Sequence, residues 1–165
     1  MNTSSIDSRE LRNALGRFAT GVCVVTTRTD DGRKAALTIN SFCSVSLDPP
    51  LVAWYLKDKA PSLPVFRDSG YFAVHVLASD QQDLATHFAK FAEDKFAPFS
   101  ERVQAGLGDV PVFGDMLACF ECRTTSIEPY GDHVMVLGHV ERFYYGSESP
   151  LLFHAGRFLE HSAAA

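Results

Sequence analysis

The sequence has little cysteine and no apolar run long enough to cross a membrane. Four cysteines in 165 residues, irregularly spaced, are too few for the disulfide framework of a small secreted protein. The longest uninterrupted apolar run, Leu51 to Leu56, has six residues, against the ~20 of a membrane-spanning helix. The first residues carry neither the basic nor the apolar segment of a secretory signal, so we expect a cytoplasmic protein without membrane contact.

Basic residues are outnumbered by acidic ones. The chain has 15 Lys and Arg against 20 Asp and Glu, a formal charge of -5, and its basic residues are scattered singly. Without a basic stripe the chain cannot neutralise a phosphate backbone, which argues against a nucleic acid partner. Apolar residues make up 46% of the chain and charged residues 21%, so we expect one well-packed globular domain.

The common catalytic and nucleotide-binding signatures are also missing. The phosphate-binding patterns G-x-x-x-x-G-K-S/T and G-x-G-x-x-G do not occur, nor do the G-x-S-x-G of hydrolases and the H-E-x-x-H of zinc proteases. Cys119 and Cys122 have the C-x-x-C spacing of redox and zinc sites. They fall in an expected strand, where residues three apart point to opposite faces, and there is no second pair, so we interpret them as structural.

Six histidines raise the question of a metal site. His133 and His139 would share a strand face but lie ~20 Å apart at ~3.3 Å per residue, too far to bind one ion together. We therefore predict no metal site, with an assembly of distant histidines as the alternative. His75 stands inside an apolar strand, and we expect it to be a hydrogen-bonded core residue.

The spacing of apolar residues predicts two clear helices. The first begins near Asp7, and its apolar face follows the spacing i, i+3, i+4, i+7 through Leu11, Ala14, Leu15 and Phe18. The second begins at Ser79, with Gln82 three residues later, and buries the face that carries Leu84, Ala85 and Phe88.

Runs of β-branched and aromatic residues predict six strands, at 22–27, 33–41, 51–56, 71–77, 117–127 and 134–143. Turn residues at 29–32 and 128–132 join neighbouring strands as hairpins. A short helix is expected at 62–68 and an irregular segment at 91–115. Hairpins in place of strand-helix-strand alternation predict a mainly β fold, an antiparallel barrel or sandwich with flanking helices.

Small polar side chains gather between Leu37 and Pro50, where an expected strand ends and two prolines break the chain. Short hydroxyl and amide groups allow a planar polar ligand to approach the backbone closely, and Lys57 could bind a phosphate. The alternative interpretation is an edge strand that ends in a polar turn.

Three segments in this order resemble the flavin reductase family, which has the FMN-binding split barrel. They are Gly16 to Val22 (GRFATGV), Thr38 to Pro50 (TINSFCSVSLDPP) and Gly131-Asp132-His133. The resemblance covers about residues 8–158 and implies an antiparallel split β-barrel with flanking helices, in a single domain over 1–165. Members of the family include the small NAD(P)H:flavin oxidoreductase components of two-component monooxygenases.

The resemblance implies a homodimer that binds FMN or FAD, reduces it with NADH or NADPH, and supplies reduced flavin to a separate oxygenase component. Residues placed at the flavin ring and ribityl chain are Thr38, Ile39, Asn40, Ser41, Ser44, Val45 and Ser46. Lys57 and Ser62 would bind the flavin phosphate, and Phe88 would close the pocket. Gly131, Asp132 and His133 resemble the nicotinamide-nucleotide motif, which would place His133 at the nicotinamide face.

Two other functions stay open on the same barrel. One is a non-catalytic flavin-binding protein or electron carrier, and the other is an oxidase of the pyridoxamine phosphate oxidase type. Cys23 and Cys43 stand where the resemblance leads us to expect Thr or another small residue. A thiol would therefore lie close to the flavin if Cys43 points inward.

Overall fold

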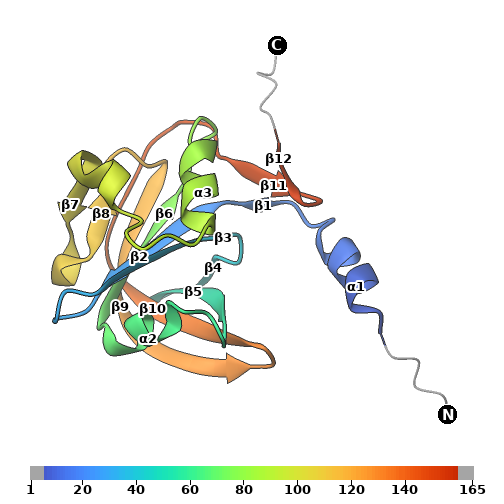
Figure 1. Ribbon diagram of the computed structural model, residues 1–165, viewed down its shortest axis with the longest axis horizontal. Helices are drawn as coiled ribbons and strands as arrows, with labels where there is room; N and C mark the ends of the chain where they lie inside the picture. Colours follow the sequence, from blue (N-terminus) through green and yellow to red (C-terminus); the bar gives the residue numbers. More distant parts are fainter. Residues whose placement is uncertain (1–5, 160–165) are drawn as a thin grey trace.

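The computed structural model describes residues 6–159, in which strands outnumber helices (Figure 1). Its helices are α1 (Ser8–Leu15), α2 (Leu63–Asp68) and α3 (Gln82–Ala89), with the 3-10 turns η1 (Ala97–Arg102) and η2 (Leu107–Asp109). The strands are β1 (Thr20–Gly21), β2 (Cys23–Arg28), β3 (Lys34–Ile39), β4 (Cys43–Leu47), β5 (Pro50–Lys57), β6 (Tyr71–Val76), β7 (Val103–Ala105), β8 (Pro111–Phe113), β9 (Ala118–Tyr130), β10 (His133–Tyr145), β11 (Leu152–His154) and β12 (Arg157–Leu159).

Seven strands form one antiparallel sheet in the order β3-β2-β6-β9-β10-β5-β4. The 13-residue strands β9 and β10 are each shared between two parts of this sheet. Residues 118–123 of β9 pair with β6, whereas residues 133–139 of β10 pair with β5. The sheet therefore divides along these two strands, which is the split antiparallel barrel expected from the sequence.

The sheet has an apolar core on each of its faces. One cluster lies inside the barrel around Trp54, Phe66 and Phe72, and the second packs α3 against the outer face through Leu84 and Phe88. Strand alternation supplies both: on β3, Ile39 belongs to the first cluster and Ala36 to the second. Because both faces of β2 are covered, Cys23 to Thr27 are all buried.

The first predicted helix is present, but its apolar face is not buried by any part of residues 6–159. One carboxylate oxygen of Asp7 accepts hydrogen bonds from the backbone N–H groups of Arg9 (2.7 Å) and Glu10 (3.3 Å), as expected for a cap. The helix nevertheless stands apart from the barrel and is joined to it through β1 (Figure 1). Leu15 is 66% exposed, and Phe18, which follows the helix, is 79% exposed.

The second predicted helix is confirmed with its buried face of Leu84, Ala85 and Phe88. Its expected beginning at Ser79 is wrong, because the helix starts at Gln82 with Gln81 as its N-cap. The amide oxygen of Gln81 instead accepts the Ala78 N–H at 2.9 Å, and its amide nitrogen donates to the Asp115 carbonyl at 2.7 Å. Gln81 thereby ties the start of the helix to the end of the irregular segment.

Five of the six predicted strands keep their approximate bounds, and the predicted strand 33–41 ends earlier, at Ile39. The sequence analysis missed β4, β7, β8 and the small sheet β1-β11-β12. The interpretation of the C-x-x-C pair as structural is confirmed: Cys119 and Cys122 are buried in different clusters on opposite faces of the sheet. Burial raises the pKa of each thiol to about 12.

His75 is the hydrogen-bonded core residue that the sequence predicts. Its side chain is fully buried, with Nδ1 at 3.1 Å from the Val24 carbonyl and Nε2 at 3.2 Å from the Phe113 backbone nitrogen. Nδ1–H donates and Nε2 accepts, so the ring is neutral and links β2, β6 and β8. Burial lowers its pKa to about 4.

Residues 6–159 contain neither a membrane-spanning helix nor a group of metal-binding side chains. No helix there is long and apolar enough to span a membrane. No three His, Cys, Asp or Glu side chains of that region are grouped so that they could hold a metal ion.

Candidate functional site

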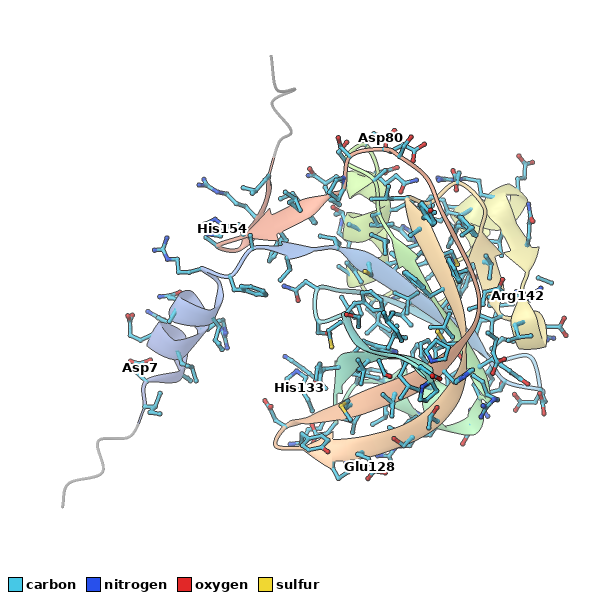
Figure 2. The ribbon with its side chains drawn as sticks, turned by 180° about the vertical axis from the view of Figure 1, so that it is seen from behind. Asp7, Asp80, Glu128, His133, Arg142 and His154 are labelled. Atoms are coloured by element: carbon cyan, nitrogen blue, oxygen red, sulfur yellow. The ribbon has the colours of Figure 1, made fainter. Side chains whose placement is uncertain are left out.

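The predicted nicotinamide motif forms the turn of the β9–β10 hairpin, and Figure 2 shows His133 near the tip of this hairpin. Tyr130 pairs with His133, which leaves Gly131 and Asp132 as the two turn residues. Gly131 has φ = +63°, a conformation that an L side chain rarely adopts, although a Cβ there would meet open space. The turn thus requires glycine for its backbone conformation rather than for room.

Lys57, Asp132 and His133 lie together beside this turn. Lys57 at the end of β5 pairs with His133, and the Asp58 N–H donates to the Asp132 carbonyl at 3.1 Å. His133 Nδ1 lies 2.7 Å from the Asp132 carboxylate. The hydrogen bond from His133 lowers the pKa of Asp132, with smaller contributions from the charges of His133 and Lys57. With Nδ1 on this carboxylate, Nε2 is the ring nitrogen left for a ligand.

The polar stretch after β3 lies along the edge strand of the large sheet. The Ser41 hydroxyl accepts the Tyr55 N–H at 3.0 Å and donates to the Tyr55 carbonyl at 3.3 Å, which fixes the chain against β5. A β-bulge lies between Ser44 and Ser46, because these residues pair with Val52 and Leu51 in turn. Asn40, Ser44 and Val45 are exposed, and Ser46 is half-buried.

Three of the predicted flavin residues have side chains that point into the protein. The Thr38 hydroxyl donates to the Ala85 carbonyl of α3 at 2.7 Å, while Ile39 is buried inside the barrel. Phe88 is fully buried among aromatic rings on the outer face of the sheet. Thr38, Ile39 and Phe88 can contact a ligand through their backbone groups, or can pack beneath residues that contact it. The roles predicted for them at the flavin stay predictions. The alternation of a strand, which places Thr38 and Ile39 on opposite faces, is the signal that could have separated them.

A large open cavity of about 1250 Å³ lies at the start of β3. Its walls come from the β2–β3 hairpin, the beginning of α2, the loop between α3 and η1, and the β7–β8 region. Ser62 is the predicted site residue that lines it, and the sequence analysis missed the rest, among them Lys34 and Lys95. No signal could have found this cavity, because its residues come from separate segments and one wall was expected to be irregular.

The chemistry available at the turn and along the edge strand is binding chemistry. The groups present are exposed amides and hydroxyls, the outer edge of β4, an ammonium and an oriented imidazole. Such groups can hold a planar heterocycle and a phosphate. Cys43 is an exposed thiol on the edge strand, whereas Cys23 is buried with its pKa raised to about 12.

Known sequences resemble this chain over nearly its whole length. The sequence model of the flavin reductase like domain matches residues 15–162. The chain is 41% identical over 152 residues, 92% of its own length and 85% of the relative's, to an FMN reductase (NADH) of Agrobacterium fabrum. It is 37% identical over 150 residues to the reductase component of a flavin-dependent trigonelline monooxygenase of Acinetobacter baylyi, covering 91% of this chain but 48% of that relative. The chain thus spans most of some relatives and about half of others.

Solved structures agree over the same region. The flavin reductase PheA2 superposes with a TM-score of 0.83 at 37% identity, covering 95% of this chain and 99% of that one. The NADH:FAD oxidoreductase SgcE6 of Streptomyces globisporus superposes with a TM-score of 0.89 at 31% identity, covering 100% and 99% of the two chains.

Proposed function

We propose that this chain, which belongs to the flavin reductase like domain family, reduces FMN or FAD with NADH or NADPH. The observation that carries the proposal is the group at the β9–β10 turn, where Asp132 orients His133 beside Lys57. A nicotinamide-binding turn is what distinguishes a reductase from a flavin carrier on the same barrel. The relatives named as NADH-dependent flavin reductases support the same activity.

The donor groups of the chain fit a flavin. The exposed Asn40 amide, the Ser44 hydroxyl and the free edge of β4 suit the polar edge of a planar heterocycle. Lys57 and Ser62 supply an ammonium and a hydroxyl for a phosphate. We assign the ring to the β3–β4 segment and the phosphate to these two residues.

Bound flavin supplies the hydride acceptor, and the task left to the protein is to hold the nicotinamide in position against it. His133 does this through Nε2, because Asp132 holds its Nδ1–H. In this assignment the imidazole orients the nicotinamide nucleotide and transfers no proton. Such a site needs no acid-base pair or nucleophile, which accounts for the missing catalytic signatures.

The chain acts as a homodimer in this proposal. Helix α1 has no buried residue, and the apolar side chains of Leu11, Leu15 and Phe18 are exposed. An isolated eight-residue helix is marginal in water, so it needs a surface to pack on. Figures 1 and 2 both show α1 away from its own barrel, where a second copy can cover it. The edge strand with the predicted flavin residues is open in one chain, and a partner subunit would complete its enclosure.

A separate oxygenase receives the reduced flavin. One relative is named as the reductase component of a flavin-dependent trigonelline monooxygenase. Another, HsaB, is named as the reductase subunit of a flavin-dependent monooxygenase. An open site in a small chain suits a flavin that binds, is reduced and leaves.

Steady-state turnover tests the proposal. Oxidation of NADH and of NADPH is followed by the absorbance of the reduced nicotinamide, with and without added FMN or FAD. Turnover that rises with added flavin supports a reductase for which flavin is a substrate. A yellow protein that does not oxidise either nucleotide would instead be a carrier or an oxidase of another substrate.

A further inference from the structure

Ser41 joins the large sheet through its side chain instead of its peptide group. Cys43 of β4 pairs with Ala53 of β5, and this register, continued by two residues, places Ser41 opposite Tyr55. Strand β4 begins only at Cys43. At the Tyr55 position the Ser41 hydroxyl accepts the Tyr55 N–H at 3.0 Å and donates to the Tyr55 carbonyl at 3.3 Å. One hydroxyl thus satisfies both peptide groups that would otherwise need a neighbouring strand.

This arrangement leaves the peptide groups of residues 40–42 free. They make no backbone hydrogen bond within residues 6–159. Side chains hold the segment on either side of the Ser41 link. The Thr38 hydroxyl donates to a carbonyl of α3 at 2.7 Å, and the Phe42 ring stacks on Phe120 of β9 with the ring centroids 5.5 Å apart. The segment is therefore fixed to α3, β5 and β9, while its own N–H and C=O groups stay available to a ligand.

Tyr55 lies between the two parts of the proposed site. On its other side β5 pairs with β10, where Tyr55 faces Met135 and Lys57 faces His133. The path from Ser41 to His133 crosses two strand spacings of ~4.8 Å and runs two residues along at ~3.3 Å each, which gives roughly 12 Å. The Ser41 hydrogen bonds thus fix the proposed flavin-binding segment against the strand that leads to the proposed nicotinamide-binding turn.

The Ser41 hydroxyl has no proton left for a flavin. It carries one O–H, which is donated to the Tyr55 carbonyl, and one of its acceptor positions takes the Tyr55 N–H. Loss of the hydroxyl would remove this partner from both peptide groups of Tyr55 and let the chain before Cys43 shift. Hydride transfer needs the reacting atoms within ~3–3.5 Å of each other, and a displacement of ~1 Å can cost ~100-fold in rate.

We propose that Ser41 is a positioning residue for hydride transfer. Its hydroxyl replaces its peptide group on Tyr55 and so holds the flavin-binding segment at a fixed distance from the nicotinamide-binding turn. The proposal rests on the proposed function for the places of the two ligands. It gives Ser41 a role different from the flavin contact that the resemblance implies. Because Ser41 acts through Tyr55, its loss lowers the rate of reduction, whereas loss of His133 raises the KM for NADH.

The test measures the rate at which NADH reduces protein-bound FMN without oxygen, by stopped flow over a range of NADH concentrations. Hydrogen exchange of the Tyr55 N–H, followed by NMR in the protein without ligand, reports the backbone link itself. Ser41→Ala removes the hydroxyl, and Ser41→Thr keeps it. Ser69→Ala is the matched control on β6, because the Ser69 hydroxyl likewise donates to the Tyr71 carbonyl at 2.7 Å and accepts the Tyr71 N–H at 3.2 Å.

Ser41→Ala is expected to lower the rate at saturating NADH about tenfold, while the NADH concentration that gives half of this rate stays that of the wild type. The Tyr55 N–H should exchange about tenfold faster, as for loss of a hydrogen bond to the backbone. Ser41→Thr should keep both wild-type values. Ser69→Ala should unfold at a lower urea concentration but reduce FMN at the wild-type rate.

A wild-type rate in Ser41→Ala would overturn the proposal. A slower rate with unchanged Tyr55 exchange would also overturn it, because the hydroxyl would then act on the flavin directly. If Ser41→Ala does not fold, Ser41→Cys decides by the same two measurements, since a thiol is a weak donor and acceptor at the same place. A wild-type protein that reduces no flavin is a distinct result, which removes the proposed function before any variant is compared.

Discussion

His75 should make the stability of the fold depend on pH in a defined window. The ring is neutral in the folded chain, where burial lowers its pKa from 6.5 to about 4. In the unfolded chain it titrates near its ordinary value. Because the folded pKa is the lower one, the contribution of His75 to stability is fully present above the unfolded pKa. It is lost as the pH falls toward the folded pKa.

The size of the effect follows from the two pKa values. A difference of about 2.5 units at about 1.4 kcal/mol per unit gives a loss of about 3 kcal/mol between about pH 7 and about pH 4. This loss is a large part of the free energy of unfolding of a typical domain, which is roughly 5–15 kcal/mol. The lowered pKa of Asp132 acts in a different window, because its contribution to stability is present above the ordinary Asp value of 3.8 and is lost only as the pH falls below that value.

The assay is chemical denaturation at a series of pH values and at one fixed protein concentration, since dimerisation would otherwise alter the apparent stability. His75→Gln is the informative variant, because an amide can donate to the Val24 carbonyl and accept from the Phe113 N–H but does not titrate. It should flatten the slope between about pH 7 and about pH 4. His154→Gln, on the separate β11 strand, serves as the control. An unchanged slope in His75→Gln would refute the assignment of this pH dependence to His75.

Three further predictions concern the site and the first helix. His133→Ala should raise the KM for NADH about tenfold and leave FMN affinity unchanged, by fluorescence titration; equal loss of both would give His133 a structural role. Gly131→Ala should cost about 1 kcal/mol in denaturation, because alanine is strained at φ = +63°, and should also raise the KM for NADH. Leu15→Glu should turn the dimer into a monomer in sedimentation, while Arg12→Glu on the polar face should not; a wild-type monomer would contradict the proposed dimer.

The elements best predicted from the sequence are those whose local residue pattern is enough to indicate which side chains are buried. The face of Leu84, Ala85 and Phe88 specifies a helix against an apolar surface, and His75 within an apolar strand specifies a buried, hydrogen-bonded ring. The turn at Gly131 follows from two residues alone. The prediction of a split barrel came from the resemblance to flavin reductases. The periodicity of apolar residues alone cannot distinguish a barrel from a sandwich.

Other features depend on contacts that the local pattern does not contain. Strand β4 was missed because the segment between Leu37 and Pro50 was interpreted as a polar stretch that ends at two prolines, although Cys43 to Leu47 alternate apolar and polar side chains. Helix α1 has an apolar face that no other part of residues 6–159 covers, so amphipathicity predicted the helix but not its exposure. The cavity around Lys95 needs β3, α3 and an irregular loop to be assembled before it exists.

Anaerobic reduction of flavin tests the central claim most directly. The protein is mixed with an excess of FMN and of NADH without oxygen, and the loss of the oxidised flavin absorbance is followed. A reductase for which flavin is a substrate should reduce many flavins per protein chain, with one NADH consumed for each. Reduction that stops at an amount equal to the protein, or does not occur, would contradict the account.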